Sequence, residues 1–200
     1  MISKSYRQIF NKAITDYHFI DDVDQAIRNP FPTDDFDNVI YEKIWIDTIQ
    51  WHLEDIIRDP NIDPENALKI KRRIDHSNQN RTDLVERIDS YYVDKFKAVK
   101  LKAEARMNTE SIGWAIDRFA ILALKVYHMK EEANRKNASE LHLTKCKEKL
   151  LILEEQSLDL GTSIDHLIAD IENGDRYTKV YHQMKMYNDP NLNPILYSQK

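Results

Sequence analysis

Hydrophobic residues recur at three- and four-residue spacing along most of the chain, which is the pattern of amphipathic helices. The spacing predicts helices over about 5–28, 38–58, 65–97, 109–134 and 139–173, and a short one near 177–184. Asn29-Pro30 ends the first helix, Asp63-Pro64 begins the third, and Gly174 ends the fifth. We therefore predict an all-α fold, a helical bundle of about five long helices plus a short C-terminal helix.

Two of these helices have distinctive apolar faces. The second carries Ile40, Ile44 and Trp51 on one side and further apolar residues on another, which is typical of a central helix. The fifth has one continuous apolar seam with alternating steps of three and four, typical of a coiled coil. The seam consists of Leu143, Cys146, Leu150, Leu153, Ser157, Leu160, Ile164, Leu167 and Ile171.

Polar residues interrupt the apolar stripe of the third helix. With about 100° per residue, Asn78 and Arg81 fall in the same arc as Ile74 and Val85. A buried guanidinium without a partner costs several kcal/mol, so this arginine needs either an ion-pair network or a ligand.

The second and fourth helices show the same anomaly, with charged residues beside tryptophan and isoleucine. If these faces converge, the bundle contains a pocket with both signs of charge. We predict that this pocket binds a small phosphorylated or carboxylated metabolite, because arginine and lysine clamp oxyanions while carboxylates accept from ligand hydroxyls or orient the arginines. The candidate ligand-binding residues are Arg58, Lys71, Arg72, Asp75, Asn78, Arg81, Asp83, Glu86, Asp89, Asp117, Arg118, Lys125 and His128. The candidate catalytic residues are His52, as a proton carrier, with Glu54 and Asp55.

Two alternatives stay open at this stage. The buried charges could form a purely structural network in a non-enzymatic homodimer that associates through the seam of the fifth helix, from Leu143 to Ile171, and through the C-terminal helix. The sequence Glu86-Arg87-Ile88-Asp89 is half of the acidic pattern of helical nucleotide pyrophosphohydrolases, so a Mg²⁺-dependent phosphohydrolase is a third interpretation. Whether the protein is an enzyme, and which cofactor it uses other than this weakly indicated Mg²⁺, the sequence leaves open.

Composition narrows the remaining classes. The 200 residues fit a single domain, 1–200, with 188–200 as a loosely ordered tail. The net charge of −5 argues against a nucleic-acid partner, and no apolar run is long enough for a membrane span. Residues 1–10 lack a secretion signal, so we expect a cytoplasmic protein. One cysteine excludes a thiolate-rich zinc site, His-Glu-x-x-His and Glu-x-x-His are absent, and we predict no metal site.

Several segments together resemble the bacterial domain-of-unknown-function family 4254. They are 50–58, 71–83, 86–89, Asn108-Thr109-Glu110-Ser111, Asp117-Arg118, His128 and Lys185-Met186-Tyr187-Asn188-Asp189-Pro190. The resemblance covers about 37–197, and the chain departs from the family pattern at Thr82 and at Ile112-Gly113. It implies a helical bacterial protein, with relatives encoded beside genes for cell-envelope sugar transfer. That context favours sugar-phosphate or nucleotide-sugar chemistry, and it assigns no catalytic residue.

Overall fold

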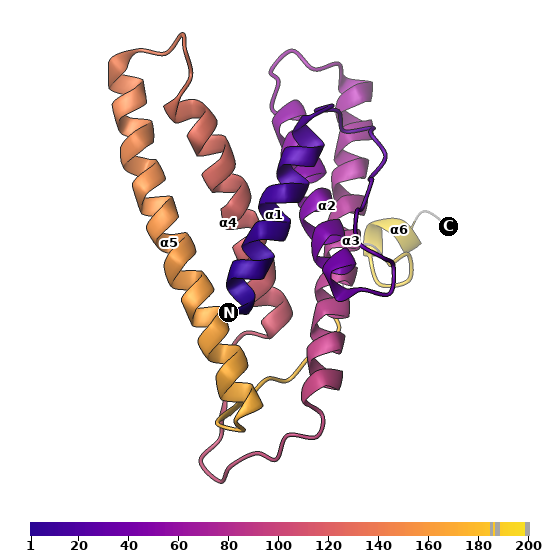
Figure 1. The fold of residues 1–200 in the computed structure, drawn as a ribbon. Coiled ribbons are helices and arrows are strands. Elements are labelled where there is room, and N and C mark those ends of the chain that lie inside the picture. Colours follow the sequence, from indigo (N-terminus) through magenta and orange to yellow (C-terminus); the bar gives the residue numbers. More distant parts are fainter. Residues whose placement is uncertain (185, 187–188, 199–200) are drawn as a thin grey trace.

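The computed structural model describes residues 1–184, 186 and 189–198. Within them the chain forms five long helices, α1 (Ile2–His18), α2 (Phe36–Ile56), α3 (Pro64–Phe96), α4 (Ile112–Ala133) and α5 (Glu140–Glu172), and one short helix, α6 (Pro194–Tyr197). The predicted all-α bundle is confirmed. Figure 1 shows α2 and α3 as one antiparallel pair and α4 and α5 as another, with α1 between them.

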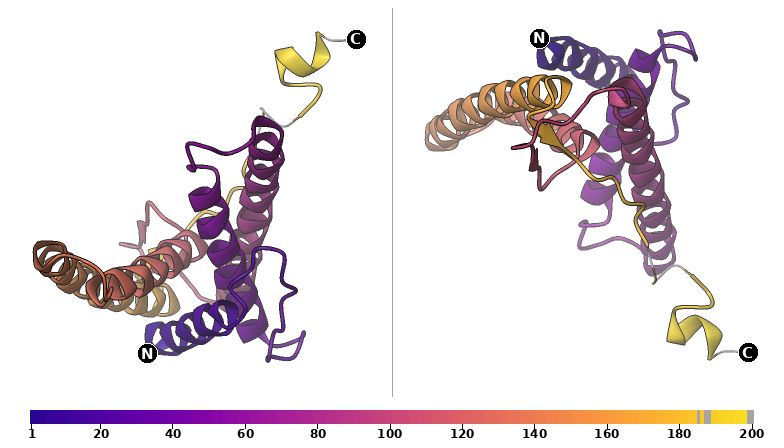
Figure 2. Two further views of the ribbon diagram at one scale, coloured as in Figure 1. Left: turned by 90° about the horizontal axis from the view of Figure 1, so that it is seen from above. Right: turned by 90° about the horizontal axis from the view of Figure 1, so that it is seen from below.

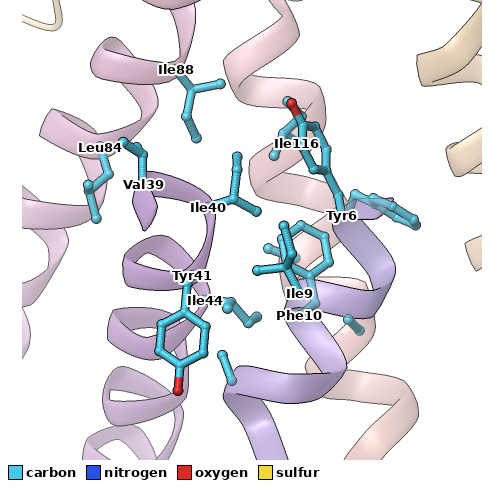
Figure 3. Packing of buried hydrophobic residues seen from close by; sticks show 14 of the residues in the cluster. Tyr6, Ile9, Phe10, Val39, Ile40, Tyr41, Ile44, Leu84, Ile88 and Ile116 are labelled. Atoms are coloured by element: carbon cyan, nitrogen blue, oxygen red, sulfur yellow. The ribbon is translucent and has the colours of Figure 1, made fainter. Parts of the chain in front are cut away.

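The core lies where α1, α2 and α4 meet. Ile40 and Ile44 of α2 are fully buried, and Figure 3 shows them facing Phe10 of α1 and Ile116 of α4. Ile88 of α3 closes the cluster from the other side. The prediction that the second helix is central is therefore confirmed.

The α5 seam is an internal face. Its members are all buried or partly buried, and α5 packs mainly against α4. Asp165 of α5 also accepts from the Ser3 backbone N–H at 3.0 Å, and so caps the first turn of α1, whose own N-cap residue Met1 makes no side-chain bond. The seam on which the dimer alternative depended is thus used within one chain.

The helix caps follow the sequence closely, with one exception. Asp63 accepts from the Asn66 N–H, and Ser139 accepts from the His142 N–H, as expected of N-caps. The fourth helix begins about three residues later than predicted, because the Ser111 hydroxyl accepts from the Trp114 N–H and caps it.

The prediction that the first helix reaches residue 28 is wrong, since α1 ends at His18. The Tyr17 carbonyl accepts from the backbone N–H groups of Ile20 and Asp21, and Asp21 adopts a left-handed φ of 57°. The side chain of Gln25 also donates to this carbonyl. These bonds turn the chain without glycine or proline, the signals that usually mark a helix end.

The predicted short helix near 177–184 is also absent; the short helix of the C-terminal region is α6 instead. Arg176–Tyr177 forms a strand, β2, that pairs in parallel with β1 (Arg106–Met107) and ties the two connections at one end of the bundle. Residues 188, 199 and 200 of the predicted loose tail lie outside the described residues. Both views of Figure 2 show α6 apart from the other helices.

Candidate functional site

Four charged side chains from three helices form a closed ion-pair network, called here the central network. Lys43 of α2 contacts Asp47 one turn along the same helix, and its Nζ lies 2.8 Å from Oδ1 of Asp117 on α4. Arg81 of α3 places Nε 2.7 Å from Asp47 Oδ1 and Nη2 2.9 Å from Asp117 Oδ1. Two positive and two negative charges therefore balance at the centre of the bundle.

The central network is almost completely removed from water. The side chains of Lys43 and Asp47 are fully buried, and those of Asp117 and Arg81 are 9% and 21% exposed. Burial opposes ionisation of Asp117, but Lys43 and Arg81 together outweigh it and lower the pKa of this carboxyl. Asp117 is therefore ionised at neutral pH. Burial raises the pKa of the fully buried Asp47, although Lys43 and Arg81 oppose this shift. The ion pairs fix the register of α2, α3 and α4.

Neutral polar groups continue the network along α2 and α3. The Asn78 carbonyl oxygen accepts from Gln50 Nε2 at 2.8 Å and from Arg81 Nη1 at 3.4 Å. Gln50 in turn accepts from the Ser77 hydroxyl at 3.0 Å. The two polar residues that interrupt the stripe of the third helix thus face α2, and both have protein partners.

A cavity of about 270 Å³ opens beside Arg81, between α2, α3 and α4. Residues of both charge signs share its wall with one indole and one isoleucine. The lining consists of Asp47, Gln50, Trp51, Glu54, Asp55, Arg58, Arg81 and Ile121. This mixture is typical of small-molecule sites, where apolar walls carry a few placed polar groups.

A second hollow of about 450 Å³, with a mainly apolar wall, shares Trp51 with the cavity and extends between α2 and the α4–α5 pair. Two lysines, Lys125 and Lys149, stand beside it. His128, Met129, Glu132, Ile152 and Leu153 complete its wall.

His52 and His128 lie close together, although they come from α2 and α4. Their ring centroids are 5.4 Å apart, and His18, the last residue of α1, lies against both. Burial lowers the pKa of His52 and of His128, so both rings are neutral at pH 7. Neither His18 nor His52 is part of the cavity lining.

Several of the other candidate residues face solvent away from the cavity. Lys71 pairs with Asp75, Arg118 with Glu110, and Asp83 accepts from Gln79. Arg72 is exposed. Periodicity placed them within or beside the apolar arcs, but they lie at the helix edge, where long side chains reach water.

The Glu86 and Asp89 carboxylates, half of the predicted Mg²⁺ pattern, accept hydrogen bonds from different elements. Asp89 is buried and accepts from the Ser111 hydroxyl at 2.6 Å and from the Gly113 N–H at 2.6 Å, so it anchors the start of α4. Glu86 accepts from His182 and from the Gln183 N–H.

Three residues of this region were missed by the sequence reasoning. Asp47 lies between Ile44 and Trp51 on the same arc of α2, and Lys43 lies four residues before it, so the criterion that found Arg81 would have found both. His18 could not be found in this way, because its proximity to His52 depends on how α1 packs on α2.

In chemical terms, the cavity holds one fixed guanidinium, one movable guanidinium and two exposed carboxylates. Arg81 is held from both sides by acids, whereas Arg58, just beyond the end of α2, is 66% exposed and pairs with Glu54.

The comparisons with known proteins identify a family but no activity. The family model described as "Protein of unknown function (DUF4254)" matches residues 37–180, so the chain belongs to this family. No curated protein and no solved structure matches the chain. Among the described residues, no helix combines the length and apolarity that a bilayer crossing requires.

Proposed function

We propose that this member of the DUF4254 family binds a small anionic metabolite with hydroxyl groups, of the sugar-phosphate class, in the cavity between α2, α3 and α4. The observation that carries the proposal is the placement of Arg81, whose guanidinium is fixed by two acids and still lines an open cavity. A preorganised donor binds an oxyanion without the entropic cost of ordering a free side chain.

Arg58 would supply the charge that the ligand requires. The central network is neutral as a whole, so Arg81 orients an anion but adds little net attraction. Arg58 lies two residues beyond the end of α2 and is 66% exposed, so it can leave Glu54 and bind a phosphate in bidentate fashion. Lys125 and Lys149 would serve a second anionic group that reaches the neighbouring hollow.

Glu54, Asp55 and Gln50 would bind the hydroxyl groups. Their oxygens line the same cavity as Trp51, and acceptors beside an aromatic ring suit a sugar, which has both polar edges and apolar C–H faces. The proposal concerns binding rather than catalysis. His52 Nε2 is 3.2 Å from His18 Nε2 and 3.7 Å from Asp21 Oδ1, away from the cavity lining.

Isothermal titration of the purified chain with glucose 1-phosphate, UDP-glucose, inorganic phosphate and glucose tests the proposal. We expect saturable binding of at least one phosphorylated sugar and none of glucose. Arg58→Gln should weaken that binding by about 10- to 100-fold, the value of a charge-assisted hydrogen bond. Arg118→Gln is the matched control, because Arg118 is also exposed, also pairs with one glutamate and lies outside the cavity.

Two outcomes would contradict the proposal. One is that no compound of the panel binds the folded wild-type chain. The other is that Arg118→Gln weakens binding as much as Arg58→Gln, because the anion would then respond to overall charge rather than to the cavity.

A further inference from the structure

Three histidines from three helices bring their imidazole nitrogens to one point. His18 ends α1, His52 lies in α2 and His128 lies in α4, and one nitrogen of each lies within 4.8 Å of the others. His18 Nε2 and His52 Nε2 lie 3.2 Å apart. Each of the three residues is partly buried.

The hydrogen bonds on the far side of two rings fix which nitrogen carries a proton. His18 Nδ1 lies 2.7 Å from the Ile14 carbonyl, which can only accept, so Nδ1 of His18 carries the hydrogen. His128 Nδ1 lies 3.1 Å from a carboxylate oxygen of Glu131, which fixes its hydrogen in the same way. When each of these rings is neutral, its lone pair is therefore on Nε2.

The His128 Nε2 lone pair accepts no hydrogen bond from the part of the chain that the structure describes. This nitrogen is buried. Trp51 stacks on this ring at 4.7 Å, and Tyr127 packs edge-on against it at 5.3 Å, so aromatic surfaces hold the ring in place. An orphaned buried acceptor is costly unless something binds it.

The spacing of the nitrogens suits a tetrahedral metal ion. A metal–nitrogen distance of about 2.0–2.1 Å implies about 3.3–3.4 Å between two nitrogens of the shell. The His18–His52 distance of 3.2 Å matches this value, and the other two separations lie within 4.8 Å and would have to shorten on binding. Histidine metal ligands typically donate their other ring N–H to a carbonyl or carboxylate, as His18 and His128 do here.

We propose that His18, His52 and His128 form a binding site for a divalent transition metal ion of the zinc class. The three Nε2 atoms are the ligands, and the fourth position is open to water or to the Asp21 carboxylate, which lies 3.7 Å from His52 Nε2. This site neighbours the proposed metabolite cavity, because Trp51 lines the cavity and stacks on His128. It does not depend on that proposal.

A second group of metal-binding side chains on the arm of α4 and α5 must be distinguished from this site. Glu132, His142 and Cys146 also place one ligand atom each within 4.8 Å of one another. In that group the atoms already contact each other, with His142 Nε2 2.9 Å from Glu132 and 3.3 Å from Cys146 Sγ. A thiolate ligand has a spectroscopic signature that imidazole lacks, so the two sites can be separated.

The test titrates Co²⁺ and Zn²⁺ into the chelator-treated chain in a buffer without phosphate. We expect one equivalent of metal to bind, with visible cobalt bands of a tetrahedral site and no thiolate-to-cobalt charge-transfer band. His52→Asn and His128→Asn should each weaken binding by at least about 100-fold. His76→Asn, an exposed histidine of α3, and Cys146→Ser should leave affinity unchanged.

Circular dichroism of each variant confirms that it is folded before its metal affinity is compared. If one of His52→Asn and His128→Asn does not fold, the other still tests the site. The proposal is overturned if the wild-type chain binds neither ion saturably. It is also overturned if Cys146→Ser abolishes binding while a folded His52→Asn retains it, because the metal would then occupy the site on the arm.

Discussion

At the residue scale, the ion pairs of the central network contribute to the stability of the fold. Asp117 accepts from both Lys43 and Arg81. Among the described residues, the fully buried Lys43 forms ion pairs with two acids, Asp47 and Asp117. Loss of one carboxylate would leave an excess positive charge in the bundle. Such an uncompensated buried charge costs far more than an exposed ion pair contributes.

We therefore expect Asp117→Asn to lower the free energy of unfolding by about 3–5 kcal/mol. Urea denaturation measures this difference. Asp75→Asn, which breaks the exposed pair with Lys71, is the control and should cost less than about 1 kcal/mol. Equal costs for the two variants would show that burial of the network has no energetic consequence.

The direction of the Asp117 pKa shift predicts how the destabilisation caused by Asp117→Asn varies with pH. The folded pKa of Asp117 is lowered below its unfolded value of about 3.9, so its contribution to stability is present above that value and is lost as pH falls through the folded pKa. Asp117 is then ionised in both states between pH 5 and pH 8. The destabilisation caused by Asp117→Asn should be the same at pH 5 and pH 8, and a cost that shrinks toward pH 5 would contradict this assignment.

Single residues also show what sequence reasoning can reach. Arg81 was identifiable because it interrupts an apolar stripe, and its partner Asp117 was suspected for the same reason. Lys71 and Arg118 passed a similar test but are exposed, because periodicity gives the angle of a residue around its helix and not the distance to the next helix. His18 required the packing of α1, which no local pattern contains.

At the element scale, most helix ends were predictable because the chain supplies cap residues. The observed ends of α2, α3 and α5 fall within about two residues of the predicted ones. The end of α1 and the parallel pairing of β1 with β2 were not predictable. The end of α1 depends on hydrogen bonds in a turn that lacks glycine and proline. The β1–β2 pairing depends on hydrogen bonds between segments that are far apart in the sequence.

The contact between α3 and α4 allows a sharp test of element packing. A Cβ atom on Gly113 would lie 2.6 Å from the Val85 carbonyl oxygen and 2.8 Å from Asp89 Cγ, whereas one on Gly161 would first meet the flexible end of Arg7, at 3.1 Å. We expect Gly113→Ala to cost about 1–3 kcal/mol of stability, as overpacking does. Gly161→Ala should cost less, because alanine is the better helix former and Arg7 can move. Thermal unfolding of both variants measures the difference, and a more damaging Gly161→Ala would contradict the packing described.

At the scale of the whole molecule, α4 and α5 form an arm that leaves the rest of the bundle toward their shared loop (Figure 1). The buried residues of α5 are concentrated in its second half, from Ser157 to Ile171, and only Cys146 is buried before them. In α4, the run of buried residues ends at Leu124 and only Ala133 follows. The arm is therefore held by few buried contacts beyond the hairpin itself.

We expect backbone amides of residues 126–156 to exchange hydrogen faster than those of α2, because local opening costs less where fewer apolar contacts are lost. Hydrogen exchange followed by mass spectrometry measures this along the chain. Protection of the arm equal to that of α2 would show that the arm and the body open together. Addition of a ligand that contacts Lys125 or Lys149 should slow exchange in the arm.

The neutrality of the central network also constrains how the family can diverge. Each positive charge is balanced by a negative one, so a relative that lost one of the four alone would carry an uncompensated charge in its interior. Positions 43, 47, 81 and 117 should therefore change in pairs of opposite charge, for example to an apolar residue at 43 with an amide at 117. In an alignment of many relatives, these positions should covary more strongly than the exposed pair at 71 and 75.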